Sequence, residues 1–139
     1  MEGAAESASS KSRLILTLSI IRYAAEALSG AKPSFEAGRY AAEHQVPIRL
    51  MNELVRLLVK TGFLVETADK GGCYVLIRAP ETITVRDVVD IILQHGASPE
   101  LLGLAHVDPA VEKMLSTLDE GLGRSFDQVT VKDLLKSET

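Results

Sequence analysis

Four side chains with nitrogen donors recur at helical spacing in the middle of the chain, namely Arg49, Asn52, Arg56 and Lys60. Residues that follow one another by three or four positions lie along one face of an α-helix. In the major groove of double-stranded DNA, arginine pairs with guanine and asparagine with adenine, while arginine and lysine neutralise phosphate. We therefore expect Arg49 and Asn52 to contact bases, and Arg56 and Lys60 to grip phosphate. Lys70, in a later turn, is a further candidate for a phosphate contact.

Glu53 lies on the same predicted helix face as these donors. Its carboxylate repels phosphate unless it contacts a base or pairs with Arg49 or Arg56. The net positive charge of this helix face is therefore small. A winged-helix domain that no longer binds DNA would have a similar face.

The charge of the chain is acidic overall but unevenly divided. The 139 residues include 15 Lys and Arg and 19 Asp and Glu, and the net charge of −4 argues against an indiscriminate nucleic-acid binder. Residues 11–62 contain eight basic and four acidic side chains, whereas residues 63–139 contain seven and thirteen. The candidate DNA-contacting residues of the helix thus lie in the positively charged segment 11–62, and positive charge is what binding to phosphate requires. A solvated helix face without a partner is the alternative interpretation.

The elements that position these residues follow from periodicity and turn chemistry. A helix over 47–61 bears the donors, and its buried stripe consists of Leu50, Met51, Leu54, Leu57 and Leu58. Two helices are predicted before it, over 11–29 and over 33–44 with Ser34 as N-cap. Strands over 63–67 and 73–78, joined by a glycine-rich turn, follow it. This order predicts a mainly α fold with a small β-hairpin, a winged helix-turn-helix.

Further helices are expected after the hairpin. They cover 85–94, with Thr84 and Asp87 as a capping box, then 108–122 and 130–135, and a short helical turn is expected at 99–104. The helix over 108–122 has an apolar stripe of Val111, Met114, Leu115, Leu118 and Leu122. This stripe favours a homodimer, and packing onto the helix over 11–29 within one chain is the alternative. We expect a disordered tail over 1–10 and a single domain over 11–139 that includes these packing or dimerisation helices.

Residues 35–84 resemble the IscR/CymR-like winged-helix transcriptional regulators of bacteria. The stretch 72–84, Gly-Cys-Tyr-Val-Leu-Ile-Arg-Ala-Pro-Glu-Thr-Ile-Thr, aligns without a gap with Gly-Gly-Tyr-Arg-Leu-Ala-Arg-Pro-Pro-Glu-Glu-Ile-Thr of that family. Residues 46–54 are similar to the family's recognition helix, residues 60–65 to the exit into its wing, and residues 129–135 to its closing helix. The resemblance implies a DNA-binding transcription regulator, dimeric through helices that correspond to 11–29 and 108–122.

The chain departs from this family at informative positions. Cys73 replaces the second wing glycine, and Val75 replaces a wing arginine and so removes a cation beside the DNA. The iron–sulfur branch has its cysteine ligands between the two helices after the wing, and residues 96–114 of this chain contain no cysteine. A cluster held by that motif is therefore excluded, and we expect no other cofactor.

A second resemblance gives a competing hypothesis. Residues 29–34 and 74–78 are similar to the cytosolic winged-helix tail of the ribonuclease BN-like (BrkB/YihY-type) membrane family. This resemblance implies a protein-interaction module without DNA binding, with a membrane protein as a possible partner.

Other side chains do not form the constellations that catalysis or metal binding requires. His44, His95 and His106 have no second ligand at metal spacing. Asp87 and Asp90 form an acid pair on which nothing else converges, so we expect a solvated face and no enzyme. Cys73, the single cysteine, forms no internal disulfide and is expected to be a half-buried apolar residue, with a thiol sensor as the minor alternative.

The chain is expected in the cytoplasm. The most apolar stretch, 14–28, contains Arg22 and Glu26 and is too short to cross a bilayer. No basic region precedes an apolar stretch at the N-terminus, so no signal peptide is indicated.

Overall fold

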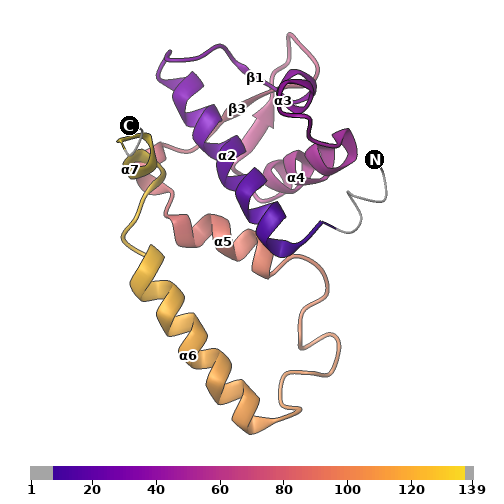
Figure 1. The fold of residues 1–139 in the computed structure, drawn as a ribbon, viewed down its shortest axis with the longest axis vertical. Coiled ribbons are helices and arrows are strands. Elements are labelled where there is room, and N and C mark those ends of the chain that lie inside the picture. The colour runs from indigo at the N-terminus through magenta and orange to yellow at the C-terminus, as the bar shows by residue number, and fades with distance from the viewer. Residues whose placement is uncertain (1–7, 137–139) are drawn as a thin grey trace.

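The computed structural model describes residues 8–136, so residues 1–7 of the expected tail and residues 137–139 lie outside the described residues. In chain order the elements are α2 (Ser10–Leu28), β1 (Phe35–Glu36), α3 (Ala37–His44), α4 (Ile48–Lys60), β2 (Leu64–Glu66), β3 (Cys73–Leu76), η1 (Pro80–Thr82), α5 (Val85–Leu93), α6 (Pro109–Phe126) and α7 (Val131–Lys136). Figure 1 shows α2 across the middle of the helix-turn-helix and sheet, with α6 at the opposite end of the molecule. Within the described residues, no helix is long and apolar enough to span a membrane.

Helix α2 forms the centre of the hydrophobic core. Ser9 is its N-cap and accepts a hydrogen bond from the backbone N–H of Ser12 at 3.0 Å. The helix packs against β3, α4, α5 and α7. Its buried residues are Leu16, Thr17, Ile20, Ile21, Ala24 and Ala25. Because α2 touches the helix-turn-helix as well as α5 and α7, these elements share one hydrophobic core.

The predicted helix over 33–44 is wrong in its first four residues. Phe35 and Glu36 form strand β1, which pairs antiparallel with Tyr74 and Cys73 of β3. Helix α3 therefore begins at Ala37, and Glu36, not Ser34, occupies the N-cap position without a capping hydrogen bond. The reason is tertiary, because the Phe35 ring is fully buried and lies 5.7 Å from Tyr23 and 5.5 Å from Tyr40, centroid to centroid.

The turn between α3 and α4 is tight and well specified. Gln45 ends α3 in the left-handed conformation, at φ 55°, and the N–H of Val46 donates to the carbonyl of Ala41 at 2.9 Å. Pro47 then occupies the N-cap of α4, and Gly62, at φ +85°, follows its C-terminal end. Helix α4 is thus one residue shorter at each end than the predicted 47–61.

The wing is a three-stranded antiparallel sheet in the order β1-β3-β2. Strands β2 and β3 pair in the register Leu64 with Leu76, Val65 with Val75 and Glu66 with Tyr74. The predicted hairpin is confirmed, although both strands are shorter than expected. The mainly α winged helix-turn-helix is confirmed as well, with β1 as an addition that the periodicity did not predict.

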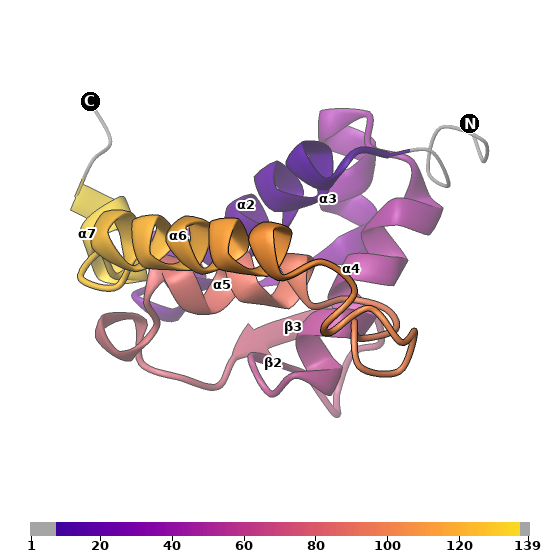
Figure 2. The same cartoon turned by 90° about the horizontal axis from the view of Figure 1, so that it is seen from below.

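The C-terminal helices return the chain to the core through α7. The capping box of α5 is confirmed, since Thr84 and Asp87 exchange hydrogen bonds of 3.0 Å in both directions. The short helical turn expected at 99–104 corresponds to a series of hydrogen-bonded turns, in which the N–H of Leu102 donates to the carbonyl of Ser98 at 3.2 Å. Figure 2 shows α5 and α6 on the side away from the sheet, and Figure 1 shows that α6 comes near α5 only toward its C-terminal end, before the chain reaches α7.

Candidate nucleic-acid interface

Helix α4 separates an apolar side from a polar side. Its buried residues are Leu50, Met51, Leu54, Val55 and Leu58. The predicted donors Arg49, Asn52, Arg56 and Lys60 are all exposed. The 3.6-residue period therefore places the four side chains on the outward face, as the sequence predicted.

Glu53 has a partner that sequence spacing did not suggest. Its carboxylate pairs with Arg13 of α2, forty positions away. The Arg13 side chain is largely buried and that of Glu53 is half-buried. A cation from outside the helix thus offsets the one acidic group of the face, so the local charge is more favourable to phosphate than α4 alone implies.

Lys70 of the wing tip pairs with Glu36, the last residue of β1. Its Nζ lies 3.4 Å from Oε2 of Glu36, and Nη2 of Arg39 lies 3.2 Å from the same oxygen. One carboxylate therefore holds two exposed cations together beside the start of α3. Arg39 was not predicted as a candidate from the sequence. Its place in the predicted helix over 33–44, within the positively charged segment 11–62, could have indicated it.

Arg56 lies on the side of α4 that faces the wing. The pKa of Tyr74 in β3 is raised above its usual 10.0, mainly by burial and then by the nearby charge of Glu66, while the charge of Arg56 opposes the rise. Arg56 is thus close enough to β3 for its field to act on the phenol.

Lys60 has a less favourable environment for a phosphate contact. It lines a surface hollow of about 380 Å³ together with Asp87 and Asp90 of α5. Asp87 belongs to the capping box of α5, and Asp90 pairs with Arg86 at 3.0 Å. Lys60 therefore stands at an acidic boundary of the face, and we expect it to contribute less than Arg56.

The end of α4 and the base of the wing are joined by Arg78. Its Nε donates to the carbonyl of Gly62 at 3.0 Å, and its Nη2 donates to the carbonyl of Thr61 at 3.2 Å. The guanidinium also lies over the Phe63 ring, 4.0 Å from the centroid. Arg78 thus caps the negative end of the helix and fixes the direction in which β2 leaves it.

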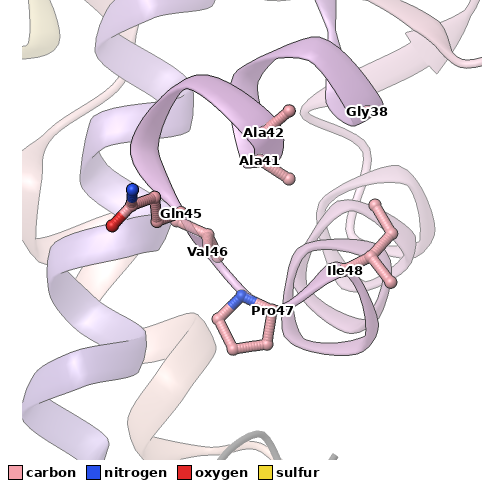
Figure 3. A pocket seen from close by; sticks show the side chains of 7 residues that line it. All are labelled: Gly38, Ala41, Ala42, Gln45, Val46, Pro47 and Ile48. Carbon is pink, nitrogen blue, oxygen red and sulfur yellow. The ribbon is translucent and has the colours of Figure 1, made fainter. Parts of the chain in front are cut away.

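A hollow of about 500 Å³ lies where α3, the turn and α4 meet. Figure 3 shows Ala41 and Ala42 of α3 facing Ile48 of α4 across it, with Pro47 below and Gln45 directed away. Its lining residues are Gly38, Ala41, Ala42, Gln45, Val46, Pro47 and Ile48.

Comparison with solved structures identifies this arrangement of helices and wing. CymR of Staphylococcus aureus matches with a TM-score of 0.63 and 16% identity, over 94% of this chain and 97% of the other. IscR of T. potens matches with a TM-score of 0.67 and 16% identity, over 89% and 83%. CymR of B. subtilis, described as the global cysteine regulator, matches with a TM-score of 0.61 and 16% identity, over 96% and 97%.

The chain has the winged-helix fold of CymR and IscR. The three matches cover between 89% and 96% of this chain, so the likeness is not confined to the wing. No model of a known protein family matches the sequence, and no curated protein matches it. The resemblance deduced from the wing stretch 72–84 is therefore confirmed at the level of the fold.

Outside the winged-helix motif, helix α6 presents an apolar surface. Val111, Met114, Leu115 and Leu118 are between 51% and 73% exposed, and no residue of α6 is buried. The helix packs against α5, where Nη1 of Arg86 donates to the carbonyl of Asp119 at 3.1 Å. Leu101, Leu102, Leu104 and Val107 of the preceding connector are exposed as well.

The remaining candidate groups have structural neighbours. His44 packs against the Tyr40 ring with centroids 4.3 Å apart, and His106 lies 3.3 Å from the carboxylate of Glu112. Among residues 8–136, no three His, Cys, Asp or Glu side chains are grouped to hold a metal. Cys73 is buried in β3, more deeply than the half-buried position expected.

Proposed function

We propose that this chain is a DNA-binding transcription regulator that acts as a homodimer. The observation that supports it best is the outward face of α4, where Arg49, Asn52 and Arg56 are all exposed. The described fold is the one that B. subtilis CymR, a regulator by its description, also has. In this proposal α4 enters the major groove and the wing follows the flanking backbone.

Each donor has a distinct role in the proposed complex. Arg49 and Asn52 lie in the N-terminal half of α4, the part of a recognition helix that contacts base edges. Arg56 grips a phosphate between the helix and the wing, with Lys60 as a weaker contact at the end of the helix. Lys70, together with Arg39, exchanges its contact with Glu36 for a phosphate when DNA binds.

The proposed dimer forms through the apolar surface of α6, with α2 contributing beside it. An exposed apolar stripe of this length indicates a protein interface. A two-fold dimer presents two copies of α4 to the two halves of a palindromic site, as in other helix-turn-helix proteins. The proposed function requires neither catalysis nor a cofactor.

The alternative hypothesis was a protein-interaction module similar to the tail of a membrane protein. The matched structures described above are CymR and IscR, and they give it no support. A cytoplasmic location remains part of the proposal, because the protein must reach DNA.

The test is binding to a fluorescently labelled duplex of mixed sequence, followed by fluorescence anisotropy at low and at physiological salt. We expect micromolar binding that weakens as salt rises, since each phosphate contact releases counterions. The double variant Arg49→Ala/Arg56→Ala should lose most of this binding. Its matched control, Lys113→Ala/Lys132→Ala, removes the same charge from exposed positions of α6 and α7 and should bind normally. Absence of binding at low salt would contradict the proposal.

A further inference from the structure

Helix α4 begins with an apolar side chain that the core does not use. Ile48 is the first residue of α4 and is 50% exposed, directly before Arg49. The donors discussed above serve guanine, adenine and phosphate, so none of them accounts for this residue. Its position matters because the first turn of a recognition helix is the part that meets base edges.

Ile48 also forms one wall of the hollow between α3 and α4. Exposed Ala42 and exposed Gly38 of α3 lie on the other side, and Pro47 closes the space toward the turn (Figure 3). Most of these groups are small or apolar, and Gln45 is the one polar side chain of the lining. The hollow therefore presents a mainly apolar surface beside the N-terminal end of α4.

The position of the hollow on the proposed DNA-binding face identifies its occupant. Exposed Ile48 belongs to the same first turn of α4 as exposed Arg49, so in the proposed complex it enters the major groove with that turn. The major groove of DNA contains one apolar group, the C5 methyl of thymine, which is flanked by the phosphate backbone.

We infer that Ile48, with Ala42 opposite, forms a contact site for the methyl group of a thymine in the DNA site. The inference deepens the proposed function and rests on it. Ile48 stands four residues before Asn52, one helical turn away and about 6 Å along the axis, which corresponds to one or two base-pair steps. The thymine should therefore lie one or two base pairs from the adenine that Asn52 contacts.

The experiment begins with selection of DNA sites from a random library by the full chain. Each thymine of the selected site is then replaced in turn by deoxyuridine, which removes the methyl group and leaves the hydrogen-bonding edge unchanged. Burial of one methyl group predicts about a fourfold loss of affinity at one thymine per half-site. At the other thymines the loss should be below about twofold.

Two variants of α4 decide whether Ile48 is responsible. Ile48→Ala should bind the thymine and deoxyuridine sites about equally, and far-ultraviolet circular dichroism should show an unchanged fold, because this side chain is half exposed. Val59→Ala is the matched control, since Val59 is 39% exposed and lies eleven residues, or about three turns, farther along the same face. The control should keep the fourfold preference for thymine.

Each contrary result has a separate meaning. Equal affinity for thymine and deoxyuridine at every position would overturn the inference and leave the proposed function standing. A preference that persists in Ile48→Ala would do the same, because another group would then contact the methyl. Failure of the selection, with no DNA bound at low salt, would overturn the proposed function together with the inference.

Discussion

Helices α4 and α6 have the same kind of sequence pattern and opposite surroundings. Both repeat apolar residues at three- and four-residue steps, with charged residues between them. In α4 the stripe is enclosed, and Met51, Leu54 and Leu58 are at most 1% exposed. In α6 the corresponding stripe is more than half exposed at Met114, Leu115 and other positions. The period thus identifies an apolar face, but it does not say which surface covers that face.

The difference follows from the place of each helix in the molecule. Helix α4 packs against α2, α3 and β2, so the chain itself supplies the cover. Among the described helices and strands, only α5 packs substantially against α6. Helix α6 also lies at one end of the molecule (Figure 1). A face left open in this way is the one that a second copy covers in the proposed dimer.

The largest expected effect is on stability and comes from α4. Leu54→Ala should lower the free energy of unfolding by about 2–5 kcal/mol, because it removes a fully buried side chain and leaves a cavity. Leu118→Ala in α6 should cost less than about 1 kcal/mol at dilute protein concentration, because this residue is 53% exposed. Urea denaturation measures the free energy of unfolding of both variants. Equal losses of stability in the two variants would contradict the expected difference between α4 and α6.

The second expected effect is on assembly and comes from α6. Met114→Glu places a charge in the proposed interface at a residue that is 73% exposed, so the monomer should fold normally and the dimer should dissociate. Lys113→Glu introduces the same side chain at the neighbouring position, which points away from the stripe, and should leave the dimer intact. Sedimentation velocity distinguishes the two, and a dimer that survives Met114→Glu would place the interface elsewhere.

A smaller effect should separate the two ends of the outward face of α4. Arg56→Ala should lower the slope of log affinity against log salt by about one, because one phosphate contact is lost. Lys60→Ala should lower it by less, because Asp87 and Asp90 line the same hollow as Lys60. Anisotropy titrations at several salt concentrations give both slopes. If the two variants behave alike, the acidic neighbours have no influence on this cation.

The smallest effect concerns α7, which anchors the chain after α6. Hydrogen bonds from the backbone and side chain of Thr130 lower the pKa of Asp133 below its usual 3.8. A carboxyl whose pKa is lower in the folded state stabilises that state above pH 3.8, and the contribution disappears as the pH falls through the lower value. Asp133→Asn should therefore be slightly less stable than the parent at neutral pH and equally stable in strong acid. Thermal unfolding at both pH values checks this, and a difference that persisted in acid would contradict it.

The C-terminal elements show which structural features can be predicted from neighbouring residues alone. The capping box of Thr84 and Asp87 and the Asp108–Pro109 start of α6 lie where the sequence predicted them. These features depend on residues within one helical turn, so no knowledge of the fold is needed to find them. The polar face of α4 was predictable for the same reason.

Contacts between distant residues set the limit of that prediction. Strand β1 exists because Phe35 enters the core and its backbone meets β3, whereas the local sequence favours a helix from Ser34. Arg13 pairs with Glu53 across forty positions, and Lys70 pairs with Glu36 across thirty-four. No spacing rule relates such residues, because their separation in the chain exceeds any helical or strand period.

The sequence by itself determined which residues form elements and which side of each helix is apolar, because periodicity, caps and turn glycines act locally. The tertiary structure decided which apolar face is enclosed, which charges neutralise one another and where an exposed Ile48 stands. These properties arise only when α2 brings the N-terminal and C-terminal elements together around one core. Burial and long-range ion pairing are properties of that packing, and a stretch of sequence does not contain them alone.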